Sequence, residues 1–329
     1  MNKFKRVTLH DIAIETGVSY ATVSAVLNPK KDGNIRVGKE KKELITLKAQ
    51  ELGYVPNQVA RSLKTTDKNL ISVFTYENMR LKEIRDEFYG FLLGIHSECE
   101  IQGLDLLILN TRKNISASSR ITMSAGSIMI GVNRDDRDIQ SLLKRNFPIV
   151  FVGRRSINSI KTNWVSFDYK SIINKIVALI SQQGYSKVAF INNNANDEPN
   201  LDKTIAINEI TKKMKIQVDN IFFTEESEPI DNFKQALFDN DVYLVNRIWQ
   251  IPLIEKFLKK NHFTLGIDKK AILLEDDWQH KYSHWTRWKG EREQLGSLAL
   301  LHLDAIIQGK PLPSKKLVPL ELIMGKSFN

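Results

Sequence analysis

Two short runs of apolar residues at helical spacing lie near the start of the chain, between residues 8 and 28. Thr8 precedes the first run with Asp11 three positions later, which is the spacing of a capping box, and Ser19 precedes the second. Gly17 supplies the turn between them. The pattern predicts two helices around a small shared core, whose members are Ile12, Ala13, Val18, Val23, Val26 and Leu27. This is the pattern of a helix-turn-helix, a common DNA-binding motif.

The second helix leaves Tyr20, Ala21 and Ser24 on its outer face. Such a helix presents its N-terminal residues to the major groove, where Tyr20 and Ser24 would reach base edges or phosphates. A helical hairpin with no role in DNA binding is the alternative, because two helices and a glycine turn are common.

A third helix is predicted over residues 38–52, with Leu44, Leu47 and Leu52 expected in the same core and Gly53 as its stop. Residues 54–64 then form a short helical pattern, with Pro56 in its first turn. A helix this short is not stable alone, so it needs a partner.

These segments resemble the LacI/GalR family of transcriptional regulators. Residues 8–28 are similar to the family's headpiece, and residues 54–64, which read YVPNQVARSLK, are similar to its hinge helix. The resemblance implies that two hinge helices of a dimer pair over the minor groove, where Leu63 wedges into a base step beside Lys64. The DNA-contacting residues expected on this basis are Thr8, Ser19, Tyr20, Ala21, Thr22, Ser24, Asn28, Lys30, Lys31, Tyr54, Asn57, Ala60, Arg61, Leu63 and Lys64.

The headpiece also departs from the family. Ala25 stands where many members have an arginine, and Ala21 occupies the neighbouring base-contact position, so Tyr20 and the hinge carry more of the expected base readout. The connection at residues 29–36 is longer and more basic than usual. It is either a solvated loop or a source of extra phosphate contacts.

Charge supports a DNA partner. The chain has 48 Lys and Arg against 38 Asp and Glu, a net charge of +10. Residues 1–69 hold 13 of the basic and 7 of the acidic residues, so more than half of the excess lies in about a fifth of the chain. A localised basic surface is the electrostatic signature of a phosphate binder.

The 329 residues, 42% of them apolar, exceed one small module and predict several domains. We expect a headpiece at 1–55, a hinge helix and linker at 56–69, and a two-lobed effector-binding and dimerisation domain at 70–329. The single cysteine, Cys99, and the lack of a signal peptide or membrane-spanning run predict a cytoplasmic protein without disulfides.

From residue 70 onward, short apolar runs alternate with helical patterns, which is typical of an α/β domain with parallel sheets. The expected strands are 70–74, 104–109, 127–130, 149–152, 188–191, 221–223, 242–245 and 272–274. The expected helices are 86–102, 139–145, 171–183, 204–214, 253–260 and 291–308. No P-loop, dinucleotide fingerprint or nucleophile elbow is present, so neither an enzyme nor a cofactor or metal site is predicted.

The family resemblance continues at 165–168, 184–191, 271–277 and 293–310. It implies the fold of periplasmic sugar-binding proteins, in which two lobes close on a small effector. The pocket residues expected by matching position are Asp168, Lys203, Asn246, Arg247, Asp276 and Trp278. Asp276 would accept hydrogen bonds from sugar hydroxyls, whereas Asp168 fits a helix cap at Ser171 equally well.

Lys203 stands where the family usually has an arginine, and Arg247 where it often has an aspartate. Both changes depart from the family's usual pocket for a neutral sugar and would shift the cleft toward positive charge, which suits a phosphorylated or carboxylated sugar. Trp278 would offer a stacking surface to a sugar ring.

These features predict a homodimeric repressor that binds a pseudo-palindromic operator in double-stranded DNA and responds to a carbohydrate or sugar-phosphate effector. The alternative is a ligand-independent architectural DNA-binding protein that uses the α/β domain only for dimerisation.

Overall fold

The computed structural model describes residues 7–28, 37–55, 69–77, 82–111, 116–131, 136–157, 160–193, 197–222, 231–313 and 316–329. The chain divides into two compact units, Met1–Asp67 and Lys68–Asn329. We call them the headpiece and the two-lobed unit and describe each by itself.

The headpiece contains three helices, α1 (Leu9–Thr16), α2 (Tyr20–Leu27) and α3 (Lys39–Glu51). Thr8 and Asp11 form the predicted capping box at the start of α1, and Gly17 ends that helix in the left-handed conformation at φ 63°. Ser19 caps α2 by accepting a hydrogen bond from the backbone N–H of Thr22 at 3.2 Å. The helix-turn-helix that the sequence predicts is confirmed in both its boundaries and its caps.

The headpiece core corrects the phase predicted for α3. Leu44 and Leu47 are 44% and 57% exposed, and Ile45 and Ala49 are buried in their place. Leu52 is partly buried against the same cluster, as expected. Ile45, Ala49 and Leu52 recur at i, i+4 and i+7, so they share one helix face. Leu44 and Leu47 also have helical spacing but lie on a different face of α3, so the sequence pattern predicted the wrong buried face.

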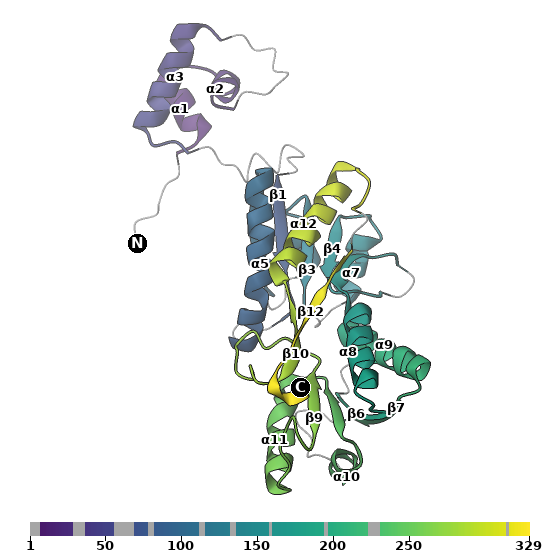
Figure 1. Ribbon diagram of the computed structural model, residues 1–329. Coiled ribbons are helices and arrows are strands. Elements are labelled where there is room, and N and C mark those ends of the chain that lie inside the picture. The colour runs from purple at the N-terminus through teal and green to yellow at the C-terminus, as the bar shows by residue number, and fades with distance from the viewer. Residues whose placement is uncertain are drawn as a thin grey trace. The chain divides into compact units, whose positions relative to one another are not determined.

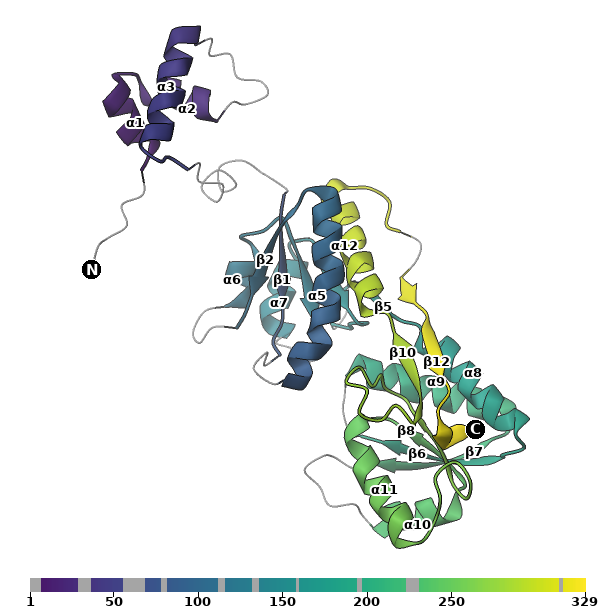
Figure 2. The same ribbon diagram turned by 60° about the vertical axis from the view of Figure 1, so that its left-hand side comes forward.

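The two-lobed unit is built on two six-stranded sheets (Figures 1 and 2). The first has the order β11-β5-β4-β3-β1-β2 and defines lobe one. Its strands are β1 (Leu70–Phe74), β2 (Asp105–Leu109), β3 (Gly126–Ile130), β4 (Ile149–Val152), β5 (Asn163–Phe167) and β11 (Leu317–Val318).

The second sheet has the order β12-β10-β9-β8-β6-β7 and defines lobe two. Its strands are β6 (Lys187–Asn192), β7 (Gln217–Phe222), β8 (Val242–Val245), β9 (Lys270–Leu273), β10 (Thr286–Gly290) and β12 (Leu320–Ile323). Neighbouring strands are parallel in both sheets except β10 and β12, which are antiparallel. The predicted parallel α/β architecture is confirmed.

Helices cover both faces of each sheet, as parallel sheets require. In lobe one, α5 (Lys82–Gln102) and α12 (Arg292–Gln308) pack side by side on one face, and α6 (Ala117–Ile121) and α7 (Asp136–Leu143) cover the other (Figure 2).

In lobe two, α8 (Tyr169–Gln182) and α9 (Glu198–Met214) share one face. The other face is covered by α10 (Asp231–Asp239) and α11 (Ile251–Lys260), which follows the short 3-10 helix η1 (Ile248–Gln250). A second 3-10 helix, η2 (Lys326–Phe328), ends the chain.

The chain passes between the two sheets three times, from β5 to α8, from β10 to α12 and from β11 to β12. The carboxyl ends of the parallel strands are the expected place for a ligand in such a fold.

Most predicted elements are present, with shifted ends. The helix expected at 204–214 begins six residues earlier because Asp197 caps it and Pro199 fits its first turn. The sequence pattern did not predict β5, β10, β11, β12, α6 and α10. The four missed strands are short or interrupted by polar residues and glycine, so the hydrophobic pattern did not single them out.

Candidate functional site

The outer face of α2 is the candidate nucleic-acid surface. Tyr20 is 49% exposed and Ala21 beside it is also exposed, whereas Val23 on the same helix is fully buried. Ser24 and Asn28 are half-buried. The N-terminal turn of α2 therefore presents side chains outward while its opposite face is fixed to the core, which is the arrangement that major-groove reading requires.

The two capping residues have their hydroxyls engaged in the headpiece itself. Thr8 accepts from the Asp11 backbone N–H at 3.3 Å and donates from its own backbone N–H to Asp11 Oδ2 at 2.8 Å. The hydroxyls of Ser19 and Thr22 lie 2.9 Å apart. Thr8 and Ser19 remain exposed, so each caps a helix and still faces solvent.

Tyr54 is half-buried against the headpiece core. Seven further residues expected at DNA lie outside the described residues: Lys30, Lys31, Asn57, Ala60, Arg61, Leu63 and Lys64.

Between the lobes lies a cavity of about 270 Å³, at the carboxyl ends of the strands. Its apolar wall is rich in aromatic rings, which are Phe88, Phe91, Phe167, Tyr169 and Trp288. Its charged side chains are Glu77, Lys203, Arg247, Glu275, Asp276 and Arg292. Flat apolar rings combined with a few fixed polar groups are typical of a site for a small polar ligand.

Asp276 follows β9 and lines this cavity. Its Oδ2 accepts a hydrogen bond from Arg292 Nη1 at 2.6 Å and a longer one from the Gly290 N–H at 3.4 Å. Both charged side chains are largely buried, at 11% and 15% exposure. Arg292 therefore holds the Asp276 carboxylate in one orientation at the cavity wall.

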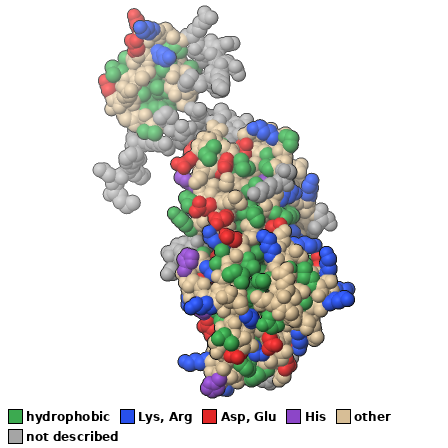
Figure 3. All heavy atoms as spheres, viewed as in Figure 1, with side chains coloured by type: hydrophobic (Ala, Val, Ile, Leu, Met, Phe, Trp, Pro, Cys, Tyr) green, Lys and Arg blue, Asp and Glu red, His purple; other side chains and the backbone are tan. Residues whose placement is uncertain are grey.

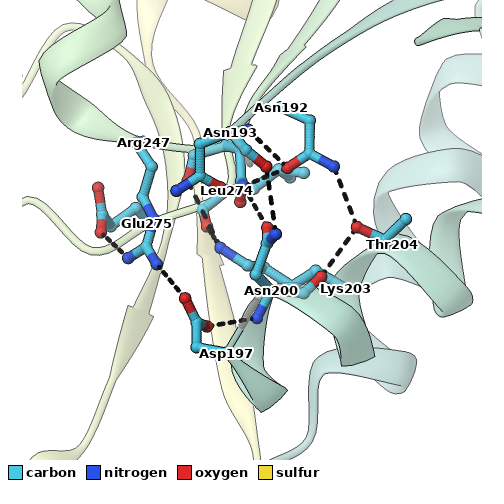
Figure 4. Close-up of polar contacts among 10 residues, drawn as sticks. Asn192, Asn193, Asp197, Asn200, Lys203, Thr204, Arg247, Leu274 and Glu275 are labelled. Carbon is cyan, nitrogen blue, oxygen red and sulfur yellow. Dashed lines mark hydrogen bonds and ion pairs between the residues drawn. The ribbon is translucent and has the colours of Figure 1, made fainter. Parts of the chain in front are cut away.

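Arg247 lies between two carboxylates (Figure 4). Its Nη1 donates to Glu275 at 3.0 Å and its Nη2 lies 3.3 Å from Asp197. Glu275 also accepts the Ile248 backbone N–H at 2.6 Å. The positive charge of Arg247 is thus compensated within the protein.

Lys203 extends from α9 with only 3% of its surface exposed. Its Nζ lies 3.3 Å from the Leu274 carbonyl (Figure 4) and 3.5 Å from the Asn246 carbonyl. It also lies 5.7 Å from the centre of the Trp288 ring. The side chain therefore places its cation at the floor of the cavity beside an aromatic ring.

Asn246 lies behind this floor and is fully buried. Its Nδ2 lies within hydrogen-bonding distance of three side-chain oxygens, those of Asn192, Asn193 and Asn200. The amides form a connected network around Lys203. Such buried polar networks fix the positions of the groups they surround.

The cavity thus brings together three of the six residues expected there, Lys203, Arg247 and Asp276. Asp168 caps α8 by accepting the Ser171 N–H at 3.0 Å and lies outside the lining, as do Asn246 and Trp278. The lining also includes Glu275, Arg292 and Trp288, which the sequence did not predict for the pocket. Glu275 directly precedes Asp276, so its position in the sequence was the one signal that pointed to the cavity.

The cavity lining is balanced in charge. Lys203, Arg247 and Arg292 supply three positive groups, and Glu77, Glu275 and Asp276 supply three negative ones. On the visible face of the two-lobed unit as well, described acidic and basic side chains are interspersed (Figure 3). The positive shift expected from Lys203 and Arg247 alone is offset by neighbours that the spacing of the sequence did not reveal.

Comparison with known proteins places the headpiece in a family. Residues 8–57 match the family model "Bacterial regulatory proteins, lacI family". The HTH-type transcriptional regulator CelR of Thermobifida fusca is 30% identical over 160 residues, and the sucrose operon repressor of Klebsiella pneumoniae is 32% identical over 166 residues. The family-model match assigns residues 8–57 of the chain to the LacI family.

The matches to these LacI-family relatives are partial. They cover 47% and 48% of this chain, and 46% and 47% of the two relatives' own lengths. Catabolite control protein A of Priestia megaterium is 27% identical over 207 residues, which cover 60% of this chain and 59% of that protein. All three names describe regulators.

Solved structures of LacI-family members extend the likeness to the whole fold. A lac repressor dimer bound to operator and the anti-inducer ONPF matches with a TM-score of 0.76 at 20% identity, covering 99% of this chain and all of that one. The CelR–cellobiose complex matches with a TM-score of 0.65 at 19% identity, covering 98% of this chain and all of that one. At this identity the match establishes the fold, a helical headpiece followed by a periplasmic-binding-protein-like unit.

Two kinds of feature are absent from the described residues. None of their helices is both long and apolar enough to cross a bilayer. No group of three or more metal-ligating side chains is gathered there.

Proposed function

We propose that this chain is a sequence-specific DNA-binding regulator of the LacI family, acting as a homodimeric repressor in the cytoplasm, with no catalytic activity. One observation carries the proposal: a single chain joins a capped helix-turn-helix with an exposed reading face to two lobes that enclose a ligand-sized cavity. The headpiece would bind a pseudo-palindromic operator through α2, and the hinge residues 56–64 would complete the interface.

A small neutral sugar is the effector that this cavity favours. Arg247 and Arg292 are paired with carboxylates, and Lys203 donates to two backbone carbonyls, so the cations of the cavity already have partners. Hydroxyl groups, in contrast, pair readily with a fixed carboxylate such as Asp276. The volume of about 270 Å³ suits a monosaccharide or a small disaccharide. The relative solved with cellobiose makes that sugar a natural first probe.

A thermal-shift panel of glucose, cellobiose, maltose, sucrose and glucose 6-phosphate tests the effector. A neutral sugar at a hundred times its Kd stabilises the folded state by about 2.7 kcal/mol, which raises the melting temperature of a unit of this size by roughly 5–10 °C. Glucose 6-phosphate should give no larger shift than glucose. A shift produced only by the phosphorylated sugar would overturn the neutral-effector assignment.

A ligand-independent DNA-binding protein is the second candidate. The pairing of Asp276 with Arg292 and of Arg247 with Glu275 favours it, because these side chains already satisfy one another in the protein alone. This candidate predicts that no member of a broad sugar panel shifts the melting temperature while DNA binding persists.

A further inference from the structure

An ion pair joins the two lobes beside the cavity. Arg154 follows β4 in lobe one, and Asp202 lies on α9 in lobe two. Arg154 Nε lies 2.8 and 3.0 Å from the two carboxylate oxygens of Asp202, and its Nη2 lies 2.6 Å from Oδ1. Two adjacent guanidinium nitrogens on one carboxylate form the strongest geometry available to such a pair.

A second contact lies one helical turn away. The backbone N–H of Ser156 in lobe one donates to Glu198 at 3.0 Å, and Glu198 is 5% exposed at the start of α9. Arg154 Nη1 also lies 3.0 Å from the Ser156 hydroxyl. The ion pair and the backbone contact therefore form one connected cluster between a loop of lobe one and a helix of lobe two.

A third contact between the lobes lies at the wall of the cavity. Arg292 in the first turn of α12 belongs to lobe one, whereas Asp276 follows β9 in lobe two. Their ion pair at 2.6 Å is the most deeply buried of the cross-lobe pairs described here.

We propose that Arg154–Asp202, Ser156–Glu198 and Arg292–Asp276 form an ionic clamp that holds the lobes together in the absence of any small molecule. The clamp sets the balance between closed and open lobes, and a ligand shifts this built-in bias toward whichever state it binds more tightly. The proposal concerns the two-lobed unit alone and depends on neither DNA binding nor the identity of an effector.

Partial burial makes the clamp strong enough to matter. The Arg154 and Asp202 side chains are 28% and 25% exposed, so water screens them less than a surface pair. The hydrogen bond to Asp202 raises the pKa of the Arg154 guanidinium above its ordinary value, as direct pairing requires. Opening the lobes would return both charges to solvent and lose the contact.

The chain contains a matched control pair. Lys170 on α8 and Glu209 on α9 lie 2.8 Å apart, and both belong to lobe two. Glu209 is on the same helix as Asp202. The Lys170–Glu209 pair is more exposed than the Arg154–Asp202 pair, and it does not cross between the lobes. Reversing Lys170 and Glu209 changes the charges of α9 without touching a cross-lobe contact.

Pulsed electron–electron double resonance on the full chain measures the distance between the two lobes directly. Spin labels at Ser141→Cys on α7 and Ser181→Cys on α8 report one exposed position in each lobe, with labelled chains diluted in unlabelled ones. The native Cys99 does not interfere, because it is 2% exposed and burial raises its pKa to about 11.

We expect one dominant distance without ligand. Arg154→Asp and Asp202→Arg should each raise the ratio of open to closed lobes about five- to tenfold, and the double exchange Arg154→Asp with Asp202→Arg should restore most of the original distribution. The exchange Lys170→Glu with Glu209→Lys should leave it unchanged.

The milder variant Asp202→Asn provides the same test if a charge reversal does not fold cooperatively. An unchanged distance distribution in folded Asp202→Asn, or equal changes in the Lys170 and Glu209 variants, would overturn the clamp.

Discussion

Asp276 is the cavity side chain whose role is most sharply defined by its contacts. Arg292 and the Gly290 N–H hold Oδ2, and within the described residues Oδ1 accepts no hydrogen bond. The carboxylate is thus fixed through one oxygen and retains acceptor capacity on the other for a hydroxyl group.

Asp276→Asn should therefore weaken binding of whichever panel sugar gives the largest thermal shift by about ten- to a hundredfold, because a hydrogen bond to a charged group contributes about 1.5–3 kcal/mol. Titration calorimetry measures the change. Asp168→Asn is the control, since Asp168 caps α8 outside the cavity lining. Equal affinities of Asp276→Asn and the wild-type chain would remove Asp276 from the site.

At this scale the sequence predicted three of the residues that line the cavity but not their partners. Lys203, Arg247 and Asp276 follow from family position. Arg247 pairs with Asp197 fifty positions away in the chain, and Asp276 with Arg292 sixteen positions away. Only the folded sheets bring such residues together, so charge balance in the cavity was not visible in the spacing of the sequence.

Among the elements, α5 and α12 make the closest contact between helices in lobe one. A Cβ added at Gly94 would lie 1.9 Å from the Glu293 carbonyl oxygen, and one at Gly296 would lie 2.2 Å from that of Phe91. At both positions the added Cβ would meet backbone atoms of the other helix, so no side-chain rotation relieves the overlap. Because α12 begins with Arg292, the crossing also positions the residue that holds Asp276.

Gly94→Ala should destabilise the two-lobed unit by about 1–3 kcal/mol, the usual cost of overpacking a dense contact. Urea unfolding monitored by tryptophan fluorescence gives the free energy. Ser97→Ala, on the exposed face of α5, is the control and should be neutral within about 0.5 kcal/mol. A Gly94→Ala chain as stable as Ser97→Ala would show that the two helices separate without cost.

Elements with regular apolar spacing and clear caps were predictable, and those defined by tertiary contacts were not. The caps at Thr8 and Ser19 are local, so the sequence located α1 and α2 accurately. The β10 segment, Thr286–Gly290, buries an arginine and ends in glycine, and it is a strand because β9 and β12 pair with it. No local pattern distinguishes such a segment from a loop.

Considered as a whole molecule, the chain divides into two units, and the proposed function assigns DNA recognition to one and its control to the other. Under the proposed function, ligand binding in the cavity would act on the lobes and DNA binding would act through the headpiece, so their coupling would pass through the stretch of chain between the two units. The ionic clamp adds a bias to the lobe equilibrium before any ligand is present. A ligand can shift that equilibrium only by the difference in its affinity for the two states.

Sequence-specific DNA binding is the central claim, and selection from a random duplex library by the full-length chain tests it most directly. Recovered sequences should share two inverted half-sites, because a dimer presents two copies of α2 related by two-fold symmetry. A Tyr20→Ala, Ser24→Ala chain should lose that preference while retaining salt-dependent binding to any duplex. A recovered pool with no common motif, bound as tightly as random DNA, would contradict the account.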